Sequence, residues 1–275
     1  MIDILLSTYN GNQYLAEQLD SLFCQTYTDW KLLVRDDGST DETVEILRSY
    51  FDKYPTKIHL YTDGIKHLGA ARSFEFLMEK STAPYVMFCD QDDIWLPQKT
   101  TFLLDKIQQL EQQYGQSTPI VVHSDLEVVA ENMDVICSSF WQYGNIHPEI
   151  LDKNVYFLGI CNSVTGCASI FNKAAKENAL PLSSKALMHD AWVAISTLKN
   201  NGIVEYIPQA LIKYRQHGKN VLGAVKYRQG SGLKHFFSRN HILYKAAHPF
   251  VYKNKLQYWY HRLRYFYVLH FSRLK

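Results

Sequence analysis

The stretch YVMFCDQDD, residues 85–93, joins five apolar or aromatic residues directly to a cluster of three carboxylates. An apolar run of this length, with Pro84 before it, is typical of a buried strand whose carboxyl end carries the acids. Three carboxylates within four residues repel one another unless a cation or solvent offsets their charge. Oxygen ligands suit Mg²⁺ or Mn²⁺, so Asp90 and Asp92 are candidate metal ligands. The alternative interpretation is an acidic cap for a helix beginning at Pro97.

Two other predicted strands end in polar clusters in the same way. IDILLS (residues 2–7) leads into residues 7–10, STYN, and KLLVR (residues 31–35) leads into Asp36-Asp37-Gly38. The acidic turn alone favours a structural interpretation, but next to Thr8-Tyr9-Asn10 it could hold a base and ribose. A Walker loop and a G-x-G-x-x-G motif are both absent from the sequence, which argues against common kinase and dinucleotide-binding folds.

Strand and helix patterns alternate along the first half of the chain. Helices are predicted at residues 13–25, 39–50 (with Ser39 and Glu42 as a capping box), 67–80, from 97 onward and at 189–199, and further strands at 57–61, 120–123, 126–129, 167–171 and 210–214. Such alternation predicts an α/β fold, a mostly parallel sheet flanked by helices. Ligands of these sheets bind beyond the carboxyl ends of the strands, where the polar clusters lie.

The composition favours a globular protein in a reducing compartment. Of 275 residues, 47% are hydrophobic and 20% charged, enough apolar surface for a sizeable core. The five cysteines are scattered without a C-x-x-C pair, which favours free thiols in the cytosol over disulfides or a zinc site. The N-terminus lacks the basic region of a signal peptide. The longest uncharged stretch, residues 154–172, is too polar to predict a membrane span.

The net charge of +2 conceals a strong asymmetry. Residues 206–275 contain 14 Lys and Arg and no Asp or Glu, so the first 205 residues carry the other 15 cations against all 27 anions. A basic, aromatic tail raises the possibility of nucleic-acid binding. The acidic first 205 residues and acid-rich strand ends count against it, so we expect no nucleic-acid partner.

Two later segments carry candidate catalytic groups. His189-Asp190 opens a predicted helix, and Asp190 is either favoured there by the helix dipole or acts as a general base. In YRQHGKN (residues 214–220), Arg215 and Lys219 could neutralise a diphosphate and His217 could ligate a metal. An ordinary basic loop is the alternative, and residue chemistry alone does not choose.

In order along the chain, seven motifs resemble those of family 2 glycosyltransferases with the GT-A fold. They are LLSTYNG (residues 5–11), RDDGSTD (35–41), HLGAARSF (67–74), DQDDIWLPQK (90–99), NSVTGC (162–167), MHDAW (188–192) and YRQHGKNVLGA (214–224). Within the family they are most similar to rhamnosyltransferases that build bacterial cell-wall and capsular polysaccharides. The subgroup often has an aromatic directly after Met-His-Asp, where this chain has Ala191 and then Trp192, so the resemblance leaves the acceptor pocket open.

The resemblance implies a role for each matching residue. It places Asp92 closest to an Mn²⁺ or Mg²⁺ ion, with Asp90 as the other acid of a D-x-D motif and His217 beside the metal or diphosphate. It makes Asp190 the catalytic base of a single displacement with inversion. The residues expected against the nucleotide-sugar, from motifs and resemblance together, are Thr8, Tyr9, Asn10, Asp37, Arg72, Asp90, Arg215 and Lys219.

The implied substrates are a nucleotide-sugar donor and a lipid-linked saccharide acceptor. The expected donor is dTDP-rhamnose. A UDP-sugar carrying galactose, glucose or N-acetylglucosamine is the first alternative, and a non-catalytic nucleotide-sugar-binding scaffold protein is the second. The resemblance thus predicts a transferase of bacterial surface polysaccharide biosynthesis.

We divide the chain into a catalytic domain, residues 1–222, and a basic aromatic helical region, residues 223–275. From Lys255 onward, apolar residues at spacings of three and four predict one helical stripe. Its members are Leu256, Trp259, Tyr260, Leu263, Phe266, Tyr267, Phe271 and Leu274. With its cations, such a helix fits the cytoplasmic surface of an anionic plasma membrane, where the protein would be peripheral. Packing on the catalytic domain or a homodimer contact is the alternative.

Overall fold

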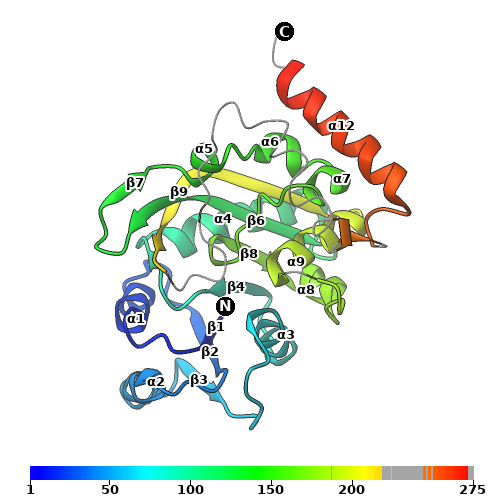
Figure 1. The fold of residues 1–275 in the computed structure, drawn as a ribbon. Helices are drawn as coiled ribbons and strands as arrows, with labels where there is room; N and C mark the ends of the chain where they lie inside the picture. The colour runs from blue at the N-terminus through cyan, green and yellow to red at the C-terminus, as the bar shows by residue number, and fades with distance from the viewer. Residues whose placement is uncertain (187, 219–223, 225–243, 246, 249, 272–275) are drawn as a thin grey trace.

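The computed structural model describes residues 1–271 except 187, 219–223, 225–243, 246 and 249. One nine-stranded sheet forms its centre (Figure 1). The order across the sheet is β3 (Ile58–Tyr61), β2 (Trp30–Asp36), β1 (Ile2–Thr8), β4 (Tyr85–Cys89), β8 (Ser169–Asn172), β6 (Ile120–Ala130), β9 (Ile203–Gln216) and β5 (Ile94–Trp95), with β7 (Val135–Cys137) paired to β6.

The sheet has a parallel half and a mixed half. Strands β3, β2, β1 and β4 are all parallel. Strand β8 is antiparallel to both β4 and β6, while β9 is parallel to β6 and β5 is antiparallel to β9. The predicted parallel arrangement therefore holds for the strands that carry the first three polar clusters.

Helices cover both faces of the sheet, so alternate residues of β1 belong to two different cores. Ile4 packs with α1 (Leu15–Phe23), α2 (Thr43–Lys53) and α4 (Lys99–Tyr114). Leu5 belongs to the core formed with α3 (Ala70–Lys80), α8 (Lys173–Ala179) and α9 (His189–Lys199). The remaining helices are α5 (Phe140–Gly144), α6 (Pro148–Leu151), α7 (Val155–Leu158), a 3₁₀ turn (Gly166–Ala168) and α12 (Lys255–Phe271).

Three local predictions were wrong. The capping box is absent: α2 begins at Thr43, and the Ser39 hydroxyl instead donates to Asp36 Oδ2 at 2.5 Å. The two strands predicted at 120–129 form one strand, β6, whose pairing with β9 is interrupted near Asp125. Strand β9 begins at Ile203, seven residues before the predicted start at 210, because its edge pairs along nearly all of β6.

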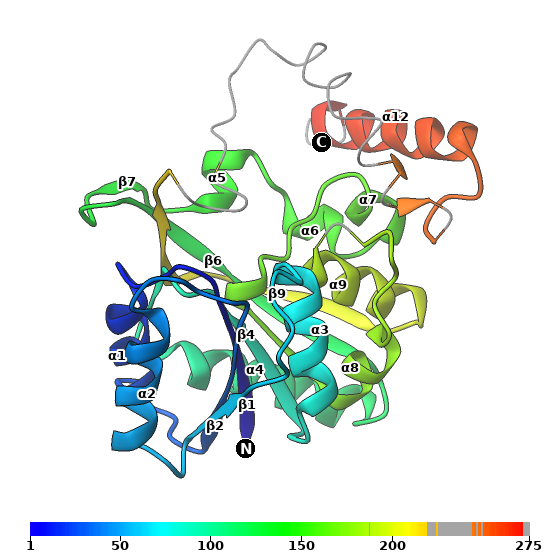
Figure 2. The same ribbon diagram turned by 60° about the horizontal axis from the view of Figure 1, so that its bottom comes forward.

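Helix α12 packs at the outer side of α7, away from β1–β3, in both views (Figures 1 and 2). The ring of His261 stacks on Tyr156 at 3.9 Å between centroids, and Tyr265 contacts Phe157. The opposite side exposes Leu256 (82%), Tyr260 (62%), Leu263 (57%) and Tyr267 (61%). The described members of the predicted stripe do share one side of α12, with Trp259 and Phe266 half-buried at its edge.

The other predictions for the C-terminal region meet the limits of the described residues. The domain boundary at 222/223, Leu274 and the side chain of Phe271 lie outside them. Within the described part of the chain, we find no helix with both the length and the apolar character needed to span a bilayer. All five cysteines are described, and each is a free thiol as predicted.

Candidate active site

The carboxyl ends of β1, β2 and β4 meet at one edge of the sheet. Thr8 is in register with Asp36, and Leu6 with Cys89, so the three polar clusters leave the sheet side by side. Gln91 pairs with the backbone of Tyr9 through both amide atoms, accepting from Tyr9 N at 2.9 Å and donating to Tyr9 O at 3.1 Å. A Cβ at Gly11 would lie 2.3 Å from Gln91 Oε1, so a side chain at position 11 would displace the Gln91 amide from Tyr9.

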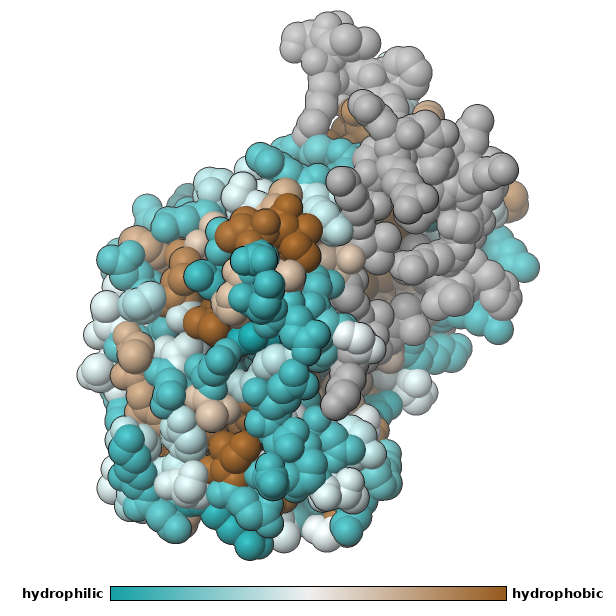
Figure 3. All heavy atoms as spheres, turned by 60° about the vertical axis from the view of Figure 1, so that its left-hand side comes forward, coloured by the Kyte–Doolittle hydropathy of each residue, from teal (hydrophilic) through white to brown (hydrophobic). Residues whose placement is uncertain are grey.

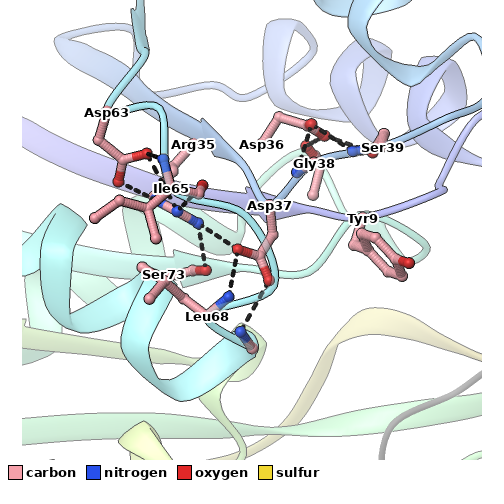
Figure 4. Close-up of polar contacts among 12 residues, drawn as sticks. Tyr9, Arg35, Asp36, Asp37, Gly38, Ser39, Asp63, Ile65, Leu68 and Ser73 are labelled. Atoms are coloured by element: carbon pink, nitrogen blue, oxygen red, sulfur yellow. Dashed lines mark hydrogen bonds and ion pairs between the residues drawn. The ribbon is translucent and has the colours of Figure 1, made fainter.

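Asp37 lies at the centre of a hydrogen-bonded network (Figure 4). Its carboxylate accepts from Arg35 Nη1 at 2.7 Å, Gly69 N at 2.8 Å and Leu68 N at 2.9 Å. Burial by itself raises the pKa of Asp37, but these hydrogen bonds together hold it below its usual value. Asp63 and Ser73 fix the buried Arg35 guanidinium in turn, at 2.8 Å each. Asp37 is thus an ionised and rigidly held acceptor.

At the end of β1 and in the loop that follows it, Thr8 and Asn10 make structural hydrogen bonds and Tyr9 is exposed. The Thr8 hydroxyl donates to Asp36 Oδ2 at 2.8 Å, and Asn10 Oδ1 accepts from Thr40 N at 2.9 Å. These two predicted ligand residues therefore tie the β1 loop to the β2 loop. The Tyr9 ring is instead 46% exposed and stands edge-on to His67 at 5.4 Å. Tyr9 is the member of this loop that offers an open aromatic surface.

Arg72 occupies a different environment from the one predicted. Its guanidinium pairs with Glu75 and donates to the carbonyl oxygens of Leu182 at 3.1 Å and Ser183 at 3.3 Å. These contacts join α3 to the segment that precedes α9. In this conformation Arg72 holds α3 against the segment before α9, and its side chain is 37% exposed.

The carboxylates after β4 fall into two groups. Asp92 Oδ2 lies 2.8 Å from His217 Nε2, which brings together two of the three predicted metal ligands. The third, Asp90, lies instead with Asp93 and Cys167, whose candidate ligand atoms are all within 4.8 Å of one another. Asp90 therefore belongs to a neighbouring cluster and does not contact the pair formed by Asp92 and His217 in the way that these two contact each other.

Electrostatics links the two groups. Burial, then repulsion by Asp92 and by Asp190, raises the pKa of Asp90 to about 7. Burial and the same crowding of carboxylates raise the pKa of Asp93 well above its usual range. The buried amine of Lys99 lies beside the cluster and donates to Cys167 O at 2.6 Å, and burial lowers its pKa well below the usual value. A divalent cation would offset the remaining repulsion, and the carboxylate donors fit Mn²⁺ or Mg²⁺.

Asp190 is held at the first turn of α9. Its Oδ2 accepts from Gly166 N at 2.9 Å and its Oδ1 from Ala191 N at 2.6 Å. Burial raises the pKa of Asp190 to about 6, although these backbone hydrogen bonds oppose the shift. A carboxylate with this pKa is ionised at neutral pH and basic enough to accept a proton.

The neighbours of Asp190 explain why it is fixed. His189 is buried between Phe74 and Phe88, with ring centroids at 4.0 and 4.4 Å, and burial lowers its pKa to about 3. A Cβ at Gly166 would lie 3.0 Å from His189 Nε2 and 3.3 Å from Asp190 Cβ, so a side chain there would press on both residues. Trp192 donates to Ala179 O at 2.9 Å and packs away from Asp190, against α8.

Arg215, predicted against the diphosphate, is buried instead. Its guanidinium donates to Asp92 O and Glu131 O, at 3.0 Å each, and pairs with Glu17. Its backbone N–H donates to Asp93 Oδ1 at 3.2 Å. Arg215 therefore supports the acidic loop from behind. The other predicted cation, Lys219, lies outside the described residues.

Sequence reasoning missed several residues that shape this site. Gln91 and Lys99 both belong to the quoted motif DQDDIWLPQK. An amide between the acids and a lysine six residues after them could have predicted contacts that support the acidic loop. Tyr14 and Glu131 gave no such signal. The Tyr14 hydroxyl donates to Glu131 Oε1 at 2.6 Å across 117 positions of sequence, which no local pattern reveals.

Comparison with known proteins defines the class. A sequence model of glycosyl transferase family 2 matches residues 3–178, so the chain belongs to this family. The dTDP-rhamnosyl transferase RfbG of Shigella flexneri is 34% identical to it over 103 residues, which are 36% of each chain.

Two solved structures share the fold. TarS of S. aureus, determined in complex with UDP-GlcNAc, superposes with a TM-score of 0.58 and 18% identity over 80% of this chain. The mannosyltransferase PcManGT of Pyrobaculum calidifontis, in complex with GDP-Man and Mn²⁺, superposes with a TM-score of 0.58 and 16% identity over 96% of it. The chain spans 59% and 64% of those two chains. The α/β GT-A architecture expected from the motifs is thus confirmed.

Proposed function

We propose that the protein is an inverting, metal-dependent glycosyltransferase that moves a sugar from a nucleotide-sugar to a saccharide acceptor. One observation carries the proposal: Asp190, a fixed carboxylate with a pKa of about 6, lies within electrostatic range of Asp90 at the strand ends. A general base beside an acidic cluster that could bind a cation suits a single displacement at a sugar carbon with a diphosphate leaving group.

Asp37 and Tyr9 would bind the base of the donor. An ionised carboxylate has about four lone-pair sites, and three N–H groups already occupy Asp37. One site is left to accept the imide N–H of uracil or thymine, while the exposed ring of Tyr9 can stack on the base. Because both bases carry this imide, these two residues favour UDP and dTDP equally.

The sugar we propose is L-rhamnose from dTDP-rhamnose, supported by the likeness to the Shigella flexneri enzyme. A UDP-sugar is the alternative, supported by the fold shared with TarS bound to UDP-GlcNAc. A non-catalytic scaffold protein would not need Asp190 to be held by Gly166 N next to an acidic cluster. The proposed setting is bacterial surface polysaccharide biosynthesis with a lipid-linked acceptor.

In the proposed reaction, Asp190 accepts the proton of the acceptor hydroxyl, whose oxygen attacks the anomeric carbon. The bond from that carbon to the diphosphate breaks, the electron pair leaves with the nucleoside diphosphate, and the configuration inverts. Asp92 and His217 would hold the metal, with Asp90 next to them. The metal, when bound, neutralises charge on the leaving group. The rigid contacts of Asp37 and Asp190 keep donor and base in fixed positions.

A donor screen tests the proposed specificity. Purified protein with Mn²⁺ or Mg²⁺ should release nucleoside diphosphate faster from dTDP-rhamnose than from UDP-glucose, UDP-galactose or UDP-N-acetylglucosamine. Addition of EDTA should stop the release, and the Asp190→Asn variant is the control for contaminating hydrolases. A faster reaction with a UDP-sugar would replace the proposed donor. Binding without turnover of any donor or acceptor would favour the scaffold interpretation.

The location we propose, peripheral on the cytoplasmic face of the plasma membrane, rests on α12. In Figure 2, β1 runs upward from the N-terminus and α12 lies at the top, on the side to which the strand ends point. Its exposed apolar side chains are flanked by the exposed cations Lys253, Lys255 and Arg264. An apolar face with adjacent cations suits an anionic lipid surface, at about 1 kcal/mol per cation near it.

Vesicle sedimentation tests this location. We expect the protein to sediment with anionic vesicles at low salt, and less at high salt because the attraction is screened. A triple variant with serine at Leu256, Tyr260 and Leu263 should sediment several-fold less, while Tyr114→Ser, exposed on α4, should behave like wild type. Wild-type protein that stays in the supernatant, or a triple variant that sediments fully, would make α12 a packing or homodimer element.

A further inference from the structure

Two segments far from it in the sequence converge on Tyr14, the residue before α1. The Tyr14 hydroxyl donates to Glu131 Oε1, just after β6, at 2.6 Å. The guanidinium carbon of Arg215 lies over the Tyr14 ring, 4.5 Å from its centroid. The His217 ring packs against the same ring at 4.9 Å between centroids. Tyr14 itself is buried.

The residues that touch Tyr14 are the ones that hold Asp92. His217 Nε2 contacts the Asp92 carboxylate at 2.8 Å, and Arg215 Nε donates to the Asp92 carbonyl oxygen at 3.0 Å. Arg215 Nη1 also donates to the carbonyl oxygen of Glu131, which closes a ring of contacts back to the Tyr14 hydroxyl. Asp92 is therefore fixed at both its side chain and its backbone by groups that pack on Tyr14.

The hydrogen bond between the Tyr14 hydroxyl and Glu131 joins a phenol donor to a carboxylate acceptor. Burial, followed by the hydrogen bond and the charge of Glu131, raises the pKa of Tyr14 to about 12. The same hydrogen bond lowers the pKa of Glu131. Tyr14 therefore remains a neutral donor and Glu131 an ionised acceptor, a charge-assisted pair. Gln13 Nε2 also donates to Glu131 Oε1, at 2.9 Å, and steadies that carboxylate.

We propose that Tyr14 is a positioning residue for the metal site, which holds His217 and Arg215 where they fix Asp92, and that Glu131 anchors Tyr14. The inference rests on the proposed function, because it assigns Asp92 and His217 to the metal. An imidazole and a carboxylate can each rotate out of a shared binding geometry, and the entropy of ordering them opposes metal binding. Packing against the Tyr14 ring removes that freedom before the metal arrives.

The test measures Mn²⁺ binding by electron paramagnetic resonance, in the presence of saturating UDP or dTDP. Loss of an outer partner of a metal ligand costs about 10–100-fold in affinity, and we expect this loss for Tyr14→Leu. Tyr14→Phe, which keeps the ring, should weaken binding less. At saturating Mn²⁺ both variants should recover most of their kcat. The matched control is Tyr50→Phe. Tyr50 lies on α2, and its hydroxyl donates to Asp20 Oδ1 on α1 at 2.7 Å, so this variant also removes one tyrosine–carboxylate hydrogen bond to the α1 region.

A double-mutant cycle with His217→Ala separates positioning from general destabilisation. If Tyr14 acts through His217, Tyr14→Leu should add much less to the loss of Mn²⁺ affinity in the His217→Ala background than in wild type. Equal effects in both backgrounds, or a Tyr50→Phe loss equal to that of Tyr14→Phe, would overturn the inference while leaving the metal site standing. If Asp92→Asn binds Mn²⁺ as tightly as wild type, both the inference and the proposed function are overturned.

Discussion

Replacement of Asp190 by asparagine should lower kcat by about 10²–10⁴, the usual contribution of a positioned general base. Asparagine keeps the shape of the side chain and one oxygen to accept the hydrogen bond from Gly166 N, but it cannot take a proton at neutral pH. Donor binding should survive, because Asp37 and Tyr9 lie at the ends of other strands. Single-turnover kinetics with the donor found in the screen, alongside equilibrium binding of the same donor, would measure the two effects separately.

The fold should not suffer from this change. Burial makes Asp190 a weaker acid in the folded protein than in the unfolded chain, where its pKa is about 3.9. Above pH 6 its charge therefore costs stability, by at most about 3 kcal/mol. Asparagine loses the hydrogen bond from Ala191 N, which offsets part of this gain, so we expect the free energy of unfolding of Asp190→Asn at neutral pH to stay within about 1–2 kcal/mol of wild type. The exposed Asp105→Asn on α4 serves as control, and a variant with wild-type turnover would place the base elsewhere.

The pH dependence follows from the same carboxylate. Asp190 is an active base only when it has lost its proton, so the rate should be constant above pH 7 and fall below about pH 6. Well below that pH, the rate should fall about tenfold per pH unit. The limb should be absent from the residual activity of Asp190→Asn. An identical limb in that variant would assign the titration to another group, with Asp90, whose pKa is raised to about 7, the first candidate.

The sequence predicted well those features that depend on neighbouring residues. The apolar runs ending in polar clusters at β1, β2 and β4 were found because a buried parallel strand and its terminal loop are contiguous. The parallel pairing of β1 with β2 and β4 then follows from the alternation of strands and helices. This local logic failed at β9, whose length is set by pairing with β6, about 80 residues earlier in the chain.

The roles of the charged residues were harder to predict, because the sequence does not reveal the direction in which a charged side chain points. Arg215 was expected to face the diphosphate and Arg72 the nucleotide-sugar, yet in this structure both turn toward backbone carbonyl groups that also need donors. A buried carbonyl without a partner costs free energy, and an arginine can satisfy two or three at once. The face shown in Figure 3 is mostly hydrophilic, with apolar groups scattered among the polar ones.

Replacement of Asp92 by asparagine should remove nearly all transferase activity. Asp92 Oδ2 faces His217 Nε2 at 2.8 Å, and loss of its charge removes the carboxylate that we assign to the metal. The effect should exceed the roughly 10–100-fold loss of affinity typical of outer partners of a metal ligand. Activity should return only in part at high Mn²⁺. The experiment compares activity and Mn²⁺ binding in wild type, Asp92→Asn and His217→Ala over a titration of the metal.

The matched variant is Asp134→Asn, an exposed carboxylate in the turn between β6 and β7, which should keep full activity and metal affinity. Asp92→Asn should unfold at the temperature of wild type, because the change removes charge from an acidic cluster in which carboxylates raise one another's pKa. Since Asp92 and His217 would share one ion, the two substitutions together should cost little more than either alone. Full activity of the wild type in excess chelator, or additive losses in the double variant, would show that Asp92 and His217 do not form a common metal site.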